Sequence, residues 1–322
     1  MTRRHNDNIV TATVPLVSVV IPTYYRNEYL DRAIASVLNQ QYEPIEIIIV
    51  DDSGERHAES VVDQYPTVEY LAHETNQGAQ AARTHGIERA SGRYINLFDD
   101  DDRMLPTKLA RQVELLESEP AVGVVYCGKQ WENGHKILPN PEIRGNVLEY
   151  ALRFRTTPAS PSAMVIDKEI LVDCLPLADR PGGDDLGMKI ELARRTQFDF
   201  VDESLLIQGE ADESRGGAMG AVTGRKQILE EYAELYEQVP PSVYQTALSH
   251  TYLLEANTHL DRQSWSPAAI KTASLAVYHA PTLQLSIVGY ALAAIFGRPG
   301  RTVAWNVYDR LLLGDEHRGG LT

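Results

Sequence analysis

The chain has 322 residues, of which 43% are hydrophobic and 23% are charged. This is the composition of a globular protein and excludes a disordered chain, a collagen-like fibre or a small disulfide scaffold. The 45 acidic and 30 basic residues give a formal charge of −15, which argues against nucleic-acid binding because the phosphates would be repelled. The length predicts one large domain or two smaller ones.

Cys127 and Cys174 are the only cysteines, so we expect no disulfide framework and a reducing, cytoplasmic location. Residues 1–8 are polar and no apolar run has the length of a bilayer, so we expect neither a signal peptide nor a membrane-spanning helix. The basic residues are 23 Arg and 7 Lys. An acidic surface with few lysines suits a protein that works at high salt, or it belongs to an ordinary soluble acidic protein.

Short apolar runs alternate with helical periods over the N-terminal part of the chain. Strands are predicted at 17–21, 46–50, 68–71, 94–98 and 122–126. Helices are predicted at 28–38 and 78–90, and a third begins near Pro106. Strands that alternate with helices predict βαβ units and therefore a doubly wound α/β sheet with helices on both faces.

The middle of the chain is more mixed, and the C-terminal region has a helical pattern. Strands are predicted at 162–166 and 198–207, helices at 168–174 and 183–195, a glycine-rich loop at 208–220, and helices from Lys226 onward. The apolar segment 282–296 is too short to span a bilayer. It is either a core helix or a helix that lies on a membrane surface, with Arg298 and Arg301 just beyond it.

Acidic residues follow two of the predicted strands. In open α/β sheets, ligands bind at the carboxyl ends of the strands, which is where Asp99–Asp102 is expected. Four consecutive aspartates repel one another, so at least one pKa should rise if no cation lies among them. On an extended chain Asp99 and Asp101 would share one face, and such carboxylates suit Mg²⁺ or Mn²⁺ bound to a diphosphate. The alternative is a solvated acidic turn that caps the next helix.

Two acidic pairs have similar alternatives. Asp51–Asp52 ends the second strand, where a carboxylate can accept a hydrogen bond from a nucleobase or a ribose, or can form an Asx turn or a helix cap. Asp184–Asp185 begins a predicted helix, where aspartate is normally an N-cap. Neither a G-x-G-x-x-G dinucleotide motif after the first strand nor a P-loop motif occurs in the sequence.

Three strings resemble the family 2 glycosyltransferases of the GT-A fold: VSVVIPTYYRNEYLDRAIASVLNQ, EIIIVDDSG and NQGAQAARTHGIERASGRYINLFDDDDRMLPTKLARQ. The likeness runs from Val17 to about Gly128, and continues more weakly to about Gly209 through PSAMVIDKEIL and GGDDLGMKIELARR. It implies a nucleotide-sugar donor, a divalent cation (Mn²⁺ or Mg²⁺) and inversion at the anomeric carbon.

The resemblance also implies roles for individual residues. Those that would bind the nucleotide sugar are Pro22, Tyr24, Arg26, Asp52, Arg83, Asp99 and Asp100. Within this set, Asp52 would bind a uracil-type base, Arg83 would contact the pyrophosphate and Asp100 would lie near the ribose. Asp101 would ligate the metal directly, and Asp99 completes that motif. Asp185 would be the general base, with Asp184 beside it on the acceptor side.

The sequence departs from the family pattern in two places. The family often has Glu before the general base, where this chain has the shorter Asp184. Many members have a His after the strand that here ends near Ile207, but residues 208–213 read QGEADE. The metal is therefore expected to use Asp101, oxygens of the donor and water.

We expect a tail at 1–14, a glycosyltransferase domain at 15–220 whose nucleotide-binding half ends near 128, and a helical region at 221–322. The expected reaction transfers sugar to a glycan or a polyprenyl-linked acceptor in cell-surface glycan synthesis, at the inner face of the cell membrane, with peripheral contact through the C-terminal helices. Two alternatives stay open. A nucleotidyltransferase would usually have a glycine-rich basic loop where Pro22–Arg26 stands, and a non-catalytic scaffold would have no need of Asp101 and Asp185.

Overall fold

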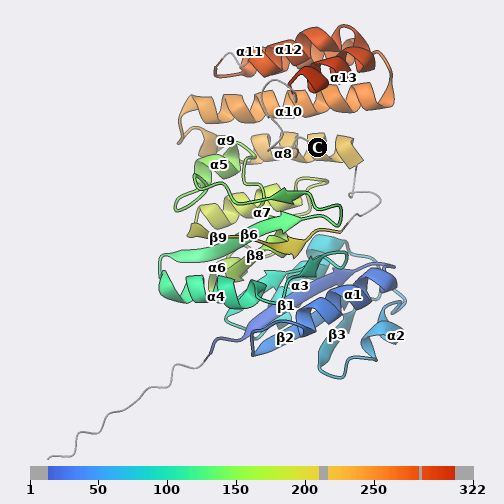
Figure 1. Cartoon of the computed structure of the whole chain (residues 1–322), viewed down its shortest axis with the longest axis vertical. Coiled ribbons are helices and arrows are strands. Elements are labelled where there is room, and N and C mark those ends of the chain that lie inside the picture. The colour runs from blue at the N-terminus through green and yellow to red at the C-terminus, as the bar shows by residue number, and fades with distance from the viewer. Residues whose placement is uncertain (1–13, 210–216, 283–284, 309–322) are drawn as a thin grey trace, which may run out of the picture.

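The computed structural model describes residues 14–209, 217–282 and 285–308. Figure 1 shows a twisted sheet with helices on both faces and further helices stacked beyond it. The strands are β1 (Val17–Thr23), β2 (Ile45–Asp51), β3 (Val68–Ala72), β4 (Tyr94–Leu97), β5 (Arg103–Met104), β6 (Val122–Gln130), β7 (Lys136–Ile137), β8 (Met164–Asp167) and β9 (Gln197–Ile207). This architecture confirms the predicted doubly wound α/β fold with a helical C-terminal extension.

The helices follow the strands in alternation and then dominate the C-terminal part. They are α1 (Asn27–Leu38), α2 (Glu59–Val62), α3 (Ala79–Arg89), α4 (Lys108–Ser118), α5 (Leu148–Leu152), α6 (Lys168–Val172), α7 (Asp184–Ala193), α8 (Gly217–Glu231), α9 (Ala233–Tyr236), α10 (Pro241–Arg262), α11 (Pro267–His279), α12 (Leu285–Ala294) and α13 (Gly297–Tyr308). A 3₁₀ turn, η1 (Pro161–Ala163), precedes β8.

The strands lie in the order β3-β2-β1-β4-β8-β6-β9-β5, with β7 beside β6. β1 to β4 are parallel, whereas β8 is antiparallel to both β4 and β6. Thr23 pairs with Asp51, so β1 and β2 end at the same level. The carboxyl ends of these strands therefore form one edge, the position where such sheets bind ligands.

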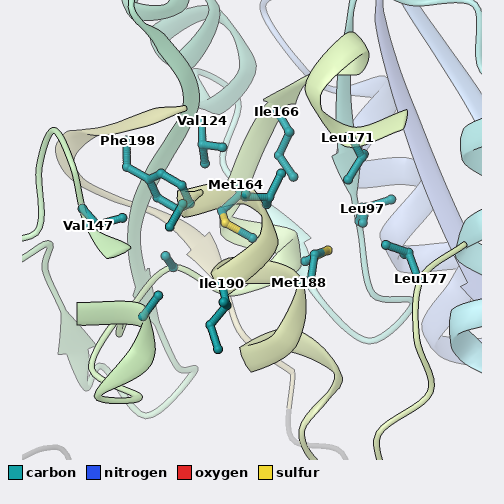
Figure 2. Close-up of a cluster of buried hydrophobic side chains, with 14 of the residues drawn as sticks. Leu97, Val124, Val147, Met164, Ile166, Leu171, Leu177, Met188, Ile190 and Phe198 are labelled. Carbon is teal, nitrogen blue, oxygen red and sulfur yellow. The ribbon is translucent and has the colours of Figure 1, made fainter. Parts of the chain in front are cut away.

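Each face of the sheet has its own hydrophobic core. On one face the buried side chains of α1 are Leu30, Ala33, Ile34 and Val37, which recur with the helical period that predicted this helix. On the other face Met188 and Ile190 of α7 pack near Met164 and Ile166 of β8 (Figure 2). This close packing holds α7 against the sheet and thereby fixes the position of its N-terminus.

The helices α10 to α13 lie at the end of the molecule remote from β1, β2 and β3, with α8 and α9 between them and the sheet (Figure 1). Their shared core is small: Ala256, Leu260, Ala269, Ala273 and Ala294. Small side chains let neighbouring helices approach closely. None of the helices in the described residues is long and apolar enough to cross a bilayer.

Several elements differ from expectation. Residues 217–220, predicted as a loop, form the start of α8, while 210–216 lie outside the described residues. Glycine suits α8 here because Gly224 packs directly on the backbone of Gly183. The predicted strand at 162–166 begins later, at Met164, because η1 occupies the preceding residues.

Candidate active site

The four aspartates of residues 99–102 form a turn after β4, in which the N–H of Asp102 donates to the carbonyl of Asp99 at 3.2 Å. Asp100 and Asp102 are buried, whereas Asp99 and Asp101 keep more of their side chains exposed. The two more exposed members are those that were expected to share one face. The prediction of an extended chain was wrong, because this hydrogen bond reverses the backbone. We call residues 99–102 the acidic turn.

Asp100 joins the acidic turn to the end of β1 and the start of α1. Thr23 Oγ1 donates to Asp100 Oδ2 at 2.8 Å, and Arg26 Nη1 donates to Asp100 Oδ1 at 3.2 Å. The same guanidinium lies 3.5 Å from Asp101. Burial raises the pKa of Asp100 to about 6, although Thr23 and Arg26 favour the charged form. Arg26 thus stabilises the acidic turn.

Burial also raises the pKa of Asp101, and that of Asp102 to about 7, and the nearby charge of Asp99 adds to both shifts. The expected rise within the acidic run is confirmed. The N–H of Gly209 donates to Asp102 Oδ1 at 2.9 Å, just beyond β9. A Cβ at Gly209 would lie 2.2 Å from the carbonyl oxygen of Asp101, so only glycine fits there.

Arg83 of α3 connects the acidic turn to α7. Its Nη2 lies 2.5 Å from Asp99 Oδ1, and its Nη1 lies 3.9 Å from Asp185 Oδ1. The residue is buried, and its Nε has no hydrogen-bond partner among the described residues. Although burial opposes the charge, Asp99 and Asp185 raise the pKa of Arg83. One guanidinium therefore lies between two carboxylates that are far apart in the sequence.

The two members of the acidic pair at the start of α7 have different surroundings. Asp184 accepts a hydrogen bond from the backbone N–H of Arg180, so it closes the turn before the helix. Asp185 faces Arg83, and 43% of its side chain is exposed. The N-cap position is Gly183, without a side-chain hydrogen bond. Neither aspartate is therefore the N-cap, and Asp185 remains available to accept a proton.

Although 43% of its side chain is exposed, partial burial raises the pKa of Asp185, with smaller contributions from Asp99 and Asp184. Arg83 and Lys189 oppose this shift because they favour the carboxylate. A carboxylate with a raised pKa is a stronger base than an ordinary aspartate once it is deprotonated. The surroundings of Asp185 therefore suit proton abstraction near neutral pH.

The two aspartates at the end of β2, Asp51 and Asp52, also have different surroundings. Asp51 accepts from the N–H groups of Ser53 and Ala58 and from the hydroxyl of Tyr70, at 2.7 to 2.9 Å. These bonds fold the loop that follows β2, so the Asx-turn alternative describes Asp51. Asp52 is buried and turns toward the segment before α3.

Asp52 has three hydrogen-bond donors. The N–H of Gln77 and His73 Nδ1 contact its Oδ1, and the N–H of Gly78 contacts its Oδ2, each at 2.7 Å. His73 Nε2 in turn lies 3.1 Å from His85 Nδ1. Gly78 has a φ of +93°, a conformation that favours glycine, and this turn aims its N–H at the carboxylate.

Residues 18–173 match the family model described as glycosyl transferase family 2. This segment belongs to that family. TuaG of Bacillus subtilis, named as a glycosyltransferase of teichuronic acid biosynthesis, is 38% identical over 106 residues, 32% of this chain and 42% of TuaG. A Campylobacter jejuni protein named GalNAc(5)-diNAcBac-PP-undecaprenol beta-1,3-glucosyltransferase is 28% identical over 142 residues, 38% of this chain and 46% of the relative. The chain spans less than half the length of both relatives.

Solved structures extend the likeness of fold over most of the chain. Residues 1–349 of Staphylococcus aureus TarS, in complex with UDP-GlcNAc, match with a TM-score of 0.62 and 14% identity over 91% of each chain. The mannosyltransferase PcManGT of Pyrobaculum calidifontis, in complex with GDP-Man and Mn²⁺, matches with a TM-score of 0.57 and 18% identity over 95% of this chain and 89% of its own. The fold is therefore that of GT-A glycosyltransferases.

The remaining predicted nucleotide-binding residues, Pro22 and Tyr24, lie at the carboxyl end of β1, beside the end of β2. Pro22 pairs with Val50, and Tyr24 lies just beyond the strand with half its surface exposed. Tyr24 packs edge to face on Tyr25, whose hydroxyl donates to the carbonyl of Ser53 at 3.4 Å. Tyr24 is thus an exposed aromatic surface near the loop after β2.

The carboxylates of the acidic turn supply only part of the ligand set that a hard divalent cation needs. The outward members of the acidic turn, Asp99 and Asp101, offer carboxylates to such an ion, and the raised pKa of Asp101 shows that a positive charge there would be favourable. Within the described residues, no three acidic, His or Cys side chains converge as a metal site. The donor and water would have to supply the other ligands.

Sequence analysis missed several residues around this site. Thr23 and Gly209 hold the acidic turn, and Ser162 Oγ accepts from the N–H of Asp99 at 3.0 Å. His73 and His85 support Asp52. Isolated Ser, Thr, His and Gly residues have no periodic pattern, so only their position next to recognised motifs could have indicated a role.

Proposed function

We propose that the protein is an inverting, metal-dependent glycosyltransferase that transfers a sugar from a nucleotide-diphosphate sugar to an acceptor hydroxyl. The observation that carries the proposal is the position of Arg83 between Asp99 and Asp185. It places the acidic turn, where the donor diphosphate would bind, beside a carboxylate that is free to act as a base. The family membership and the relatives' names support the same reaction.

In this mechanism Asp185 takes the proton of the acceptor hydroxyl as its oxygen attacks the anomeric carbon. The bond from that carbon to the diphosphate breaks on the opposite side, so the configuration inverts. No covalent sugar–enzyme intermediate is required, in contrast to retaining glycosidases. Arg83 would hold Asp185 in place and contribute positive charge next to the diphosphate. Asp184 supports the start of α7 beside the acceptor.

A cation would bind to Asp101, assisted by Asp99, as Mn²⁺ or Mg²⁺. When bound, it would neutralise charge on the leaving diphosphate. The structural neighbour PcManGT in complex with GDP-Man and Mn²⁺ supports this choice. Asp100 is held by Thr23 and Arg26, and we place it near the ribose.

We propose a uracil-type base because of the hydrogen bonds at Asp52. A carboxylate has about four lone-pair positions, and His73, Gln77 and Gly78 occupy three of them. One position remains, which matches the single N3–H of uracil. Guanine presents two neighbouring N–H donors and would need two acceptors. The exposed Tyr24 and the adjacent Pro22 would contact the same nucleotide.

The acceptor is expected to be a glycan or a polyprenyl-linked glycan of the cell surface, as the names of the two curated relatives suggest. Leu292, Ile295, Phe296 and Val303 of the α12–α13 region are exposed. Phe296 and Val303 also line an apolar hollow between these two helices. We propose that this apolar patch contacts the inner face of the membrane, where a polyprenyl-linked acceptor would lie.

Product analysis tests the proposal directly. The purified protein would be incubated with UDP-sugars and Mn²⁺, and the released nucleotide would be identified. Release of UDP supports a glycosyltransferase, and binding without turnover indicates a scaffold. A parallel incubation with UTP and a sugar 1-phosphate would release pyrophosphate if the protein were a nucleotidyltransferase. A thermal-shift comparison of UDP with GDP, with and without chelator, tests the base and the metal because ligands stabilise by mass action.

A further inference from the structure

A cavity of about 210 Å³ lies against the start of α7, where α3, the end of α8 and the segment between α6 and α7 contribute its other walls. Its apolar wall includes Leu177 and Met188, which belong to the hydrophobic core on that face of the sheet (Figure 2). The packed core therefore fixes the shape of the cavity. The volume is smaller than the roughly 300 Å³ at which pockets for drug-sized ligands begin, so the cavity suits one small ring.

Gln80 lines this cavity and has no partner for its side chain. It is the second residue of α3, and only 4% of its surface is exposed. No hydrogen bond joins its amide to any residue in the described part of the chain. Buried amides are nearly always hydrogen-bonded, because an unmade bond is costly. Two N–H donors and one carbonyl oxygen are therefore available to a group from outside the protein.

Asp184 offers a second unused group at the wall of the cavity. Its Oδ1 accepts from the backbone N–H of Arg180, whereas its Oδ2 accepts no hydrogen bond from a described residue. The surrounding polar groups are held in place. Arg180 donates from Nε and Nη2 to Glu231 at 2.8 and 2.5 Å, and from Nη2 to the hydroxyl of Tyr232 at 3.3 Å. The polar part of the wall is thus preorganised.

The wall has more negative than positive charge. Four carboxylates and two guanidinium groups line the cavity, and both guanidinium groups already form ion pairs. This excess repels a phosphate or a carboxylate. An ammonium group has no acceptor for the N–H groups of Gln80. The ligand chemistry that fits is a neutral ring with several hydroxyls, which both donate and accept, and with C–H groups that pack on the apolar wall. A saccharide ring has these properties.

The cavity adjoins the proposed reaction centre but is separate from the proposed diphosphate site. Gln80 lies one helical turn before Arg83 on α3, and Asp184 directly precedes Asp185 on α7. None of residues 99–102 lines the cavity. A ligand bound in the cavity would therefore lie on the side of the proposed base.

We propose that this cavity is an acceptor subsite that binds one uncharged saccharide ring of the glycan acceptor through Gln80 and Asp184. This assignment rests on the proposed function. Hydroxyls of the ring would accept from the amide of Gln80 and donate to Asp184 Oδ2, while its C–H groups would pack against Leu177 and Met188. Binding of this ring would orient a neighbouring hydroxyl of the acceptor toward Asp185.

Saturation-transfer NMR with three methyl glycosides tests the subsite, on protein that holds UDP and Mg²⁺ so that the donor site is filled. The probes are the methyl glycosides of glucose, N-acetylglucosamine and glucuronic acid. At least one of the two neutral glycosides should bind, and the anionic glucuronide should bind about tenfold more weakly because the wall is negatively charged. A wild type that binds neither neutral glycoside, or that binds the glucuronide as tightly, would overturn the inference.

Variants locate the binding site. Gln80→Leu nearly keeps the size of the side chain but removes its donors and acceptor, so it should weaken glycoside binding about tenfold. Ala178→Trp, at an exposed position of the wall, should block the cavity and abolish binding. Val172→Trp, which is also exposed but lies at the end of α6 outside the cavity, should match the wild type. Melting temperatures show that the variants are folded. Glycoside binding that survives both Gln80→Leu and Ala178→Trp would contradict the assignment.

Cys174 gives an independent readout of where the sugar binds, because it lines the cavity whereas Cys127 is fully buried. Burial raises the pKa of the Cys174 thiol to about 11. Alkylation by iodoacetamide is therefore followed at about pH 9, where a fraction of the thiol is ionised. A saturating neutral glycoside should slow the labelling of Cys174, measured by peptide mass. Labelling at an unchanged rate would place the sugar elsewhere.

Failure of this inference and failure of the proposed function give different results. Release of UDP from a UDP-sugar by a wild type that binds no neutral glycoside would remove the subsite and leave the proposed function standing. Binding of a glycoside in the cavity by a protein that releases no UDP would support the saccharide site and count against the proposed function.

Discussion

Arg83 Nη1 lies 3.9 Å from the carboxylate of Asp185, while the other terminal nitrogen of the same guanidinium contacts the acidic turn. In the proposed reaction, the donor side and the acceptor side would thereby be linked through one buried cation. Its charge favours the ionised form of Asp185, the form that accepts a proton.

Asp185→Asn should lower the transfer rate by roughly 10²- to 10⁴-fold, because general-base catalysis contributes about that much. The UDP affinity and the melting temperature should stay close to those of the wild type, since Asp185 makes no capping bond. Rates under single-turnover conditions and a thermal-shift measurement check this.

Asp184→Asn is the matched comparison. Asp184 accepts from the backbone N–H of Arg180. Asparagine keeps an acceptor oxygen but loses the charge that strengthens this bond, so the replacement should cost about 1 kcal/mol of stability at most and less of the rate. If Asp184→Asn abolishes transfer while Asp185→Asn does not, the base has been assigned to the wrong residue.

Arg83→Gln should shift the acid limb of the pH profile of kcat/KM to higher pH. The base acts when deprotonated, so the rate falls as the pH drops through the pKa of Asp185. That pKa is already raised, and Arg83 opposes the rise, so removing Arg83 raises it further. Arg89→Gln on the same helix removes an exposed pair with Glu69 and should leave the profile unchanged. An unmoved limb in Arg83→Gln would show that another group titrates.

Asp101→Asn should abolish turnover and weaken the metal-dependent part of UDP binding, because the direct ligand of the cation would be lost. Isothermal titration of UDP with Mn²⁺ and with chelator measures that part. Asp63→Asn changes an exposed carboxylate at the end of α2 and should bind UDP as the wild type does. Wild-type affinity that does not respond to chelator would contradict the metal proposal.

Asp52→Asn should reduce UDP affinity roughly tenfold to a hundredfold, since its amide NH₂ would face backbone N–H donors and displace the segment before α3. Asp51→Asn is the control: it should mainly lower the melting temperature, because Asp51 holds the loop after β2. Tighter binding of GDP than UDP by the wild type would refute the argument from the lone pairs of Asp52.

The apolar patch on α12–α13 can be tested by flotation with liposomes. Phe296→Asp combined with Leu292→Asp should reduce the fraction that floats, because both side chains are exposed and apolar. Leu38→Asp, at the far end of the molecule on α1, should not change flotation. A wild type that stays unbound at low and high salt would remove membrane contact from the proposal.

The sequence by itself determined the alternation of strands and helices in residues 17–130, because apolar period and turn residues are local signals. It also indicated the likeness of residues 18–173 to family 2 glycosyltransferases and which acidic residues stand at strand ends. It located α8 incorrectly, because Gly217, Gly220 and Gly224 read locally as a loop. The close packing of Gly224 on Gly183, which favours glycine within this helix, is a tertiary contact that no local pattern reveals.

Only the tertiary structure decided how the surroundings of neighbouring aspartates differ. Asp51 and Asp52 are neighbours, as are Asp184 and Asp185, and apart from the family resemblance no local pattern in the sequence separates the members of either pair. Their differences come from backbone N–H donors and from Arg83, all contributed by other elements. Hydrogen bonds and ion pairs between segments that are distant in the sequence form only in the packed fold. The surroundings of Asp185 therefore could not be predicted from the sequence.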